Sequence, residues 1–119
     1  MSTPKSPPGA GPSGRRLWRS ILTDFELAEC ELQLLRELTR VVDRLDGLAA
    51  ILDTDGLVVA GGAAGPKAHP ALVEARQLAI TQARLTKALR VPLGDEKDVR
   101  RPPRRPGARG VYNPAGGAA

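Results

Sequence analysis

The sequence predicts an all-α fold in which a short N-terminal helix precedes a long antiparallel helical hairpin, with disordered basic tails at both ends. Apolar residues recur at helical spacing in three separate stretches. Aromatic residues make up only 3% of the chain, so the apolar content is mostly aliphatic and suits narrow contacts between helices. The 13 glycines and 11 prolines crowd toward the ends and one middle loop. The 119 residues are enough for one domain.

Composition divides the chain into three parts. Residues 1–13 have Pro or Gly at nearly every second position, which predicts a disordered N-terminal tail. Residues 14–92 hold the three helical stretches and are predicted to form a helical oligomerisation domain. Residues 93–119 are rich in Arg, Pro and Gly, which predicts a disordered basic C-terminal tail.

The first helix is predicted at about 15–25. Its apolar residues fall at positions i, i+3, i+4 and i+7, on one face: Trp18, Ile21, Leu22 and Phe25. Arg15, Arg16 and Arg19 lie around its exposed N-terminal end. Positive charge there opposes the helix dipole, a small cost that an anionic partner would offset.

The second helix is predicted at about 28–53. Its main apolar residues are spaced alternately four and three apart: Leu34, Leu38, Val41, Leu45, Leu48 and Leu52. A second apolar stripe follows one residue behind, at Leu35, Val42 and Ala49. The charged residues of the remaining face are expected to pair locally: Glu37, Arg40, Asp43, Arg44 and Asp46. Cys30 is expected to be at least partly buried.

The second helix should end in a turn at Asp55-Gly56. A brief extended piece at 57–59 and a Gly-rich loop ending at Pro66 then lead to the third helix. That helix is predicted at about 70–90, with apolar contact positions that include Leu78, Leu85 and Leu89. The stretch "GPKAHPALVEARQ" before and within it is interpreted as a rigid structural corner formed by Pro66, His69 and Pro70. Pro70 suits the first helical turn, and a residue before proline is held extended.

No credible catalytic residues emerge, so an enzyme is the least expected class. "GGAAGPK" differs from a phosphate loop because Pro66 removes a backbone donor and Ala68 supplies no hydroxyl group for magnesium. One His and one Cys cannot assemble a zinc site within a single chain. Neither a cofactor nor a metal is expected. Since no apolar run reaches the roughly 18 residues of a membrane span, we expect a cytoplasmic protein that is not bound to a membrane.

The basic charge is concentrated at the ends of the chain. Residues 1–20 carry four basic and no acidic side chains, and residues 92–119 carry six basic and three acidic ones. Residues 21–91 carry ten acidic and eight basic side chains. This distribution predicts contact with a polyanion such as double-stranded DNA. The predicted phosphate contacts lie in the first helix and the C-terminal tail: Arg15, Arg16, Arg19, Arg100, Arg101, Arg104, Arg105 and Arg109.

Two long helices and a short one cannot enclose much apolar surface, and two unburied stripes on the long helix would be costly, so we expect a homo-oligomer, most simply a ring. The predicted oligomerisation residues are those of the two long helices: Leu34, Leu38, Val41, Leu45, Leu48, Leu52, Leu78, Leu85 and Leu89.

Four stretches give the chain a family resemblance: "GRRLWRSILTDFEL", "ELQLLRELTRVVDRLDGL", "DGLVV" with the following "GPKAHPALVEARQ", and "LTKALRVPL". Over residues 14 to 94 the chain resembles the small terminase subunits of actinobacterial tailed phages and prophages. The resemblance implies a non-enzymatic protein of the host cytoplasm that recognises viral DNA, assembles as an oligomer and presents DNA to the large terminase subunit, which holds the ATPase and nuclease.

Two other functions remain open from the sequence. A helical adaptor would use its tails to bind a protein partner, and should give no salt-sensitive shift of DNA. A helical DNA-binding regulator would stop at a dimer and protect a palindromic site.

Overall fold

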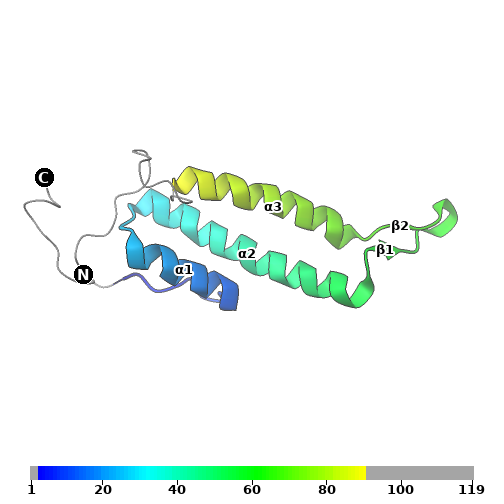
Figure 1. Ribbon diagram of the computed structural model, residues 1–119, viewed down its shortest axis with the longest axis horizontal. Coiled ribbons are helices and arrows are strands. Elements are labelled where there is room, and N and C mark those ends of the chain that lie inside the picture. The colour runs from blue at the N-terminus through cyan, green and yellow to red at the C-terminus, as the bar shows by residue number, and fades with distance from the viewer. Residues whose placement is uncertain (1–2, 91–119) are drawn as a thin grey trace, which may run out of the picture.

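The computed structural model describes residues 3–90, and within them three helices and a small hairpin follow one another (Figure 1). The elements are α1 (Pro12–Asp24), α2 (Glu29–Asp55), β1 (Val58–Val59), the 3-10 helix η1 (Gly62–Ala64), β2 (Lys67–Ala68) and α3 (Pro70–Leu89). The predicted all-α class and long helical hairpin are confirmed. Helix α1 begins three residues before its predicted start, whereas both ends of α2 and α3 lie within two residues of theirs.

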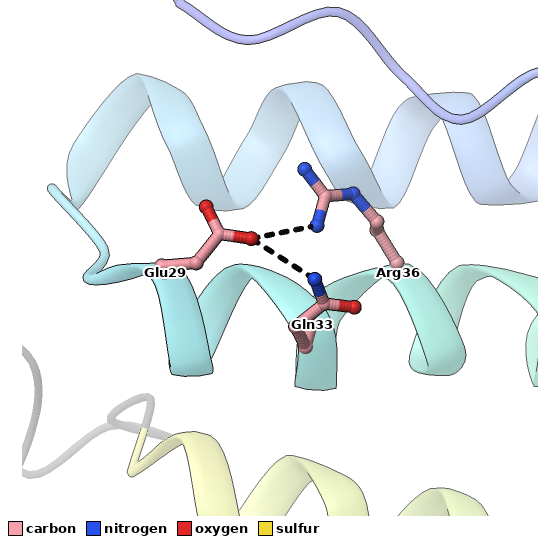
Figure 2. Close-up of polar contacts among 3 residues, drawn as sticks. All are labelled: Glu29, Gln33 and Arg36. Carbon is pink, nitrogen blue, oxygen red and sulfur yellow. Dashed lines mark hydrogen bonds and ion pairs between the residues drawn. The ribbon is translucent and has the colours of Figure 1, made fainter.

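The ends of α2 follow from local chemistry. The backbone N–H of Ala28 donates to the Glu31 carboxylate over 2.7 Å, and Glu29 and Glu31 place negative charge in the first turn. Glu29 also accepts from Gln33 over 2.9 Å and from Arg36 over 3.3 Å, which links the first two turns (Figure 2). At the other end Gly56 takes a φ of +84°, and its N–H donates to the Leu52 carbonyl oxygen over 2.8 Å.

Helices α2 and α3 run antiparallel, joined by the hairpin that extends beyond their shared end (Figure 1). Strands β1 and β2 pair antiparallel, with Val58 opposite Ala68 and Val59 opposite Lys67. The tip is tight, because a Cβ at Gly61 would collide with the carbonyl group of Gly65. The predicted extended piece is therefore one strand of a real hairpin.

The apolar core lies where α1, the first half of α2 and the end of α3 meet. It contains Trp18, Ile21, Leu22, Phe25, Leu35, Leu38 and Leu89. Helix α1 flanks only the first half of α2, so among the described helices the second half of α2 has α3 alone beside it (Figure 1). One end of the molecule is thus a three-helix core and the other a two-helix pair.

Residues 3–11, expected to be disordered, form no helix or strand but contact the helices. The Trp18 indole N–H donates to the Pro4 carbonyl oxygen over 2.8 Å. The Gly11 N–H donates to Asp43 over 2.7 Å. Pro7 and Pro8 line a small pocket of about 170 Å³ against α2. These contacts hold residues 3–11 against the helices near both ends of this segment.

Candidate nucleic-acid interface

Helix α1 separates an apolar face from a basic one. Trp18, Ile21 and Leu22 are buried against the rest of the molecule, whereas Arg15, Arg16 and Arg19 are all exposed. Arg15 and Arg19 each stand three residues before a buried residue, Trp18 and Leu22, so they border the apolar face, and their exposure follows from how α1 packs. The three arginines predicted to contact phosphate therefore belong to one short, well-anchored helix.

These arginines bind no carboxylate within residues 3–90. The Arg15 guanidinium donates to the Ala10 carbonyl oxygen, and that of Arg16 donates to the Ser13 hydroxyl over 3.2 Å. By contrast, Arg36, Arg40 and Arg90 each pair with a glutamate. Guanidinium groups without a carboxylate partner retain their charge and most of their donors for a phosphate.

Asp43 fixes the start of α1 from the neighbouring helix. Its two carboxylate oxygens accept from the backbone N–H groups of Gly11, over 2.7 Å, and Gly14, over 2.8 Å. Gly11, at the N-cap position, has no side chain with which to cap the helix, so Asp43 supplies the missing acceptor. Its negative charge also complements the helix dipole. Asp46 adds a hydrogen bond from the Ser13 hydroxyl.

This arrangement has a consequence for anion binding. Free N–H groups at the start of a helix are a ready site for phosphate. In α1 the carboxylate of Asp43 already occupies the Gly11 and Gly14 N–H groups. The exposed arginine side chains are therefore the main donors that this helix offers to a phosphate.

The role of Asp43 and Asp46 is not apparent from sequence spacing alone. Both were expected to pair within α2, as Arg40 does with Glu37 over 2.9 Å. They instead bind residues some thirty positions away in the chain. The sequence "GPSG" carries the available signal: two glycines flank the start of a helix that has no capping side chain of its own.

The residues of the predicted corner lie between α2 and α3. His69 is the N-cap of α3, where its Nδ1 accepts from the Ala71 N–H over 2.9 Å. Its Nε2 lies 2.9 Å from Asp55 Oδ2. Since Nδ1 accepts a hydrogen bond, Nε2 must carry the proton and donate to Asp55. Pro70 occupies the first turn of α3, and Pro66 lies exposed in the loop before β2. Both ring nitrogens of His69 are thus engaged in fixing the two helices.

The structure corrects part of the predicted oligomerisation surface. Leu38, Val41 and Leu89 are at most 3% exposed in the single chain. The helices of one chain already cover them, because the seam of α2 is shared between α1 and α3. The other six predicted residues are partly buried: Leu34, Leu45, Leu48, Leu52, Leu78 and Leu85.

Large apolar side chains are exposed elsewhere. The most exposed are Ile51 on α2, Leu57 and Val58 at the hairpin, and Val73 and Ile80 on α3. Cys30, expected to be at least partly buried, is exposed near the start of α2.

The predicted tail arginines lie outside the described residues: Arg100, Arg101, Arg104, Arg105 and Arg109. Within residues 3–90 no three His, Cys, Asp or Glu side chains come together in a way that could hold a metal ion. No helix in the same part of the chain has both the length and the apolar character needed to cross a membrane.

Comparison of the chain with protein-family models, with curated proteins and with solved structures finds no match.

Proposed function

We propose that this protein is the DNA-recognition subunit of a viral genome-packaging motor, a small terminase subunit. The observation that carries the proposal is the basic face of α1. Arg15, Arg16 and Arg19 are exposed, have no carboxylate partner among residues 3–90, and belong to a helix anchored by Asp43 and by the core. The family resemblance in the sequence supplies the biological setting.

In the proposed mechanism, the three arginines of α1 grip the phosphate backbone. Guanidinium groups bind phosphate oxygens in pairs, and a rigid helix presents them with fixed spacing. Backbone contacts orient a protein on DNA but carry no base sequence directly. Several copies of α1, one from each subunit of a homo-oligomer, would multiply the contacts and raise the affinity of the assembly for double-stranded DNA. The assembly would then present the DNA to the large terminase subunit, and the chain itself performs no catalysis.

The salt dependence of DNA binding tests this proposal. Each neutralised phosphate contributes about −0.9 to the slope of log affinity against log salt concentration. A triple variant with Arg15, Arg16 and Arg19 replaced by alanine should reduce the magnitude of this slope by about 2.7 for each chain bound. Alanine favours helices, so α1 should persist. Gel shifts over a range of salt concentrations measure the effect.

A matched control is available on α3. Arg76, Arg84 and Lys87 are also exposed and form no ion pair within the described residues. Their triple alanine variant removes the same charge but should keep most of the wild-type slope. If the salt slope falls equally in both triple variants, net charge alone explains the fall. That outcome would contradict a specific role for α1. If the five tail arginines also bind phosphate, replacing them should make the slope shallower by about a further 4.5 units.

The other two functional classes give different results. A protein adaptor would bind the large terminase subunit without any salt-sensitive shift of DNA. A dimeric regulator would show a salt-sensitive shift but protect a palindromic DNA site as a dimer. Packaging requires both DNA binding and a complex with the large subunit, which co-purification of the two proteins would detect.

A further inference from the structure

The N-terminal strap, residues 3–11, is bound to one side of α1. The Trp18 indole N–H donates to the Pro4 carbonyl oxygen over 2.8 Å, and the Arg15 guanidinium donates to the Ala10 carbonyl oxygen. Arg15 and Trp18 are three residues apart on a helix, so both hydrogen bonds form on the same side of α1. The strap therefore runs beside the helix that carries the proposed phosphate contacts (Figure 1).

The middle of the strap is fixed against α2. The Ala10 N–H donates to the Pro7 carbonyl oxygen over 3.2 Å, and Gly9 within this turn takes a φ of +80°. Pro7 and Pro8 line a pocket together with Thr39 of α2. Because the proline ring fixes φ, this part of the chain has few other conformations to occupy. The strap is thus an ordered part of the structure with a defined position along α1.

Lys5 is the one charged residue of the strap. It follows Pro4, whose carbonyl oxygen Trp18 holds, and its side chain is exposed with no ion pair among residues 3–90. The acid that contacts the strap, Asp43, already accepts from two backbone N–H groups at the start of α1. The ammonium group of Lys5 is therefore available to an external anion.

We propose that Lys5 is a fourth phosphate contact, which the strap places beside α1, and that Trp18 is the positioning residue that holds it there. The inference rests on the proposed function, since it extends the surface by which α1 binds DNA. A lysine on a fixed segment loses less conformational entropy on binding than a lysine on a free tail, and so contributes more to the affinity.

Removal of the Lys5 charge tests the contact. Lys5→Ala should reduce the magnitude of the slope of log affinity against log salt concentration by about 0.9 for each chain bound. Lys67→Ala is the matched control, because Lys67 is exposed on β2, has no ion pair within residues 3–90, and carries the same charge. The control should keep the wild-type slope. Gel shifts over a range of salt concentrations measure both variants.

A shift of the charge by one residue tests whether its position is fixed. The double variant Lys5→Ser with Ser6→Lys exchanges two neighbours and leaves the composition and the net charge unchanged. Successive side chains of an extended segment point in different directions, so the lysine should miss its phosphate and the slope should match that of Lys5→Ala. A free tail would tolerate the exchange and bind DNA as the wild type does.

Release of the strap gives an independent result. Trp18→Phe keeps an aromatic ring in the core but removes the N–H that donates to Pro4. In this background the native and exchanged orders of Lys5 and Ser6 should give the same slope, because the strap no longer holds one register along α1. Circular dichroism verifies that the helices of each variant are intact. If Trp18→Phe does not fold, the exchange variant decides the question alone.

Two outcomes would overturn this inference: equal slopes for Lys5→Ala and Lys67→Ala, or wild-type binding by the exchange variant. The triple arginine variant of α1 separates this inference from the proposed function. An unchanged slope in that variant would remove the proposed function. The expected fall there, together with no effect of Lys5→Ala, would remove only the contact at Lys5.

Discussion

Asp43 stabilises the junction of α1 and α2, because its carboxylate accepts hydrogen bonds from two backbone N–H groups. Replacing Asp43 with alanine leaves both donors without that acceptor and should lower the free energy of unfolding by about 2 kcal/mol. Asparagine retains one carbonyl oxygen and should recover about half of this loss. Urea denaturation followed by Trp18 fluorescence measures the change. Asp53→Ala is the control, since Asp53 is an exposed acid on the same helix that accepts no such hydrogen bond from residues 3–90. Equal losses at the two positions would argue against a capping role for Asp43.

His69 makes two separable contacts at the corner between the long helices. Alanine at this position removes both the cap on the Ala71 N–H and the bond to Asp55, and should cost about 1 kcal/mol. Asparagine is a good N-cap residue and should retain the first contact while losing the second. Thermal unfolding should therefore rank the wild type, His69→Asn and His69→Ala in decreasing stability. If the asparagine variant were no more stable than the alanine variant, the cap would contribute nothing.

At the level of the elements, two helical glycines have opposite surroundings. A Cβ at Gly14 would lie 3.1 Å from the Thr39 carbonyl oxygen and closer still to Asp43, because α1 lies close against α2 there. A Cβ at Gly47 in α2 would meet no atom of residues 3–90 within 4 Å. Alanine is intrinsically better than glycine in a helix by about 1 kcal/mol, so packing decides the sign of each substitution.

Gly14→Ala should consequently destabilise the protein by about 1–2 kcal/mol, since helix α1 must shift away from α2. Gly47→Ala should stabilise it by about 0.5–1 kcal/mol. Chemical denaturation at low protein concentration compares the two variants without a contribution from self-association. A stabilising effect at both positions would show that α1 does not approach α2 as closely as the structure has it.

At the scale of the whole molecule, stability should differ between the two ends. Leu35, Leu38 and Leu89 are almost fully buried in the three-helix end, whereas Ala71 is the one buried side chain of the described two-helix end. Local opening requires less energy where few apolar groups are buried. In the monomer, backbone amides of residues 34–41 should exchange with solvent more slowly than those of residues 46–54.

Hydrogen–deuterium exchange read out by mass spectrometry measures this difference. Uniform protection along α2 in the monomer would contradict a division into two ends.

The sequence by itself determined the helices of this protein. Apolar spacing, proline at the start of α3 and glycine after α2 are local signals, and they predicted the three helices with ends close to those observed. The sequence also predicted that the three arginines of α1 lie around its exposed N-terminal end, and all three are exposed.

Only the tertiary structure decided which surfaces remain available. Apolar spacing marks a residue for contact but does not say whether its partner belongs to the same chain, so Leu38 and Leu89, expected between subunits, lie instead in the core of one. The hydrogen bond that the Gly11 N–H donates to Asp43 joins residues 32 positions apart, and no local sequence pattern predicts a contact at that separation. The second half of α2 is likewise uncovered by α1 only because α1 stops about halfway along α2 (Figure 1), and the reach of one helix along another is a property of their packing.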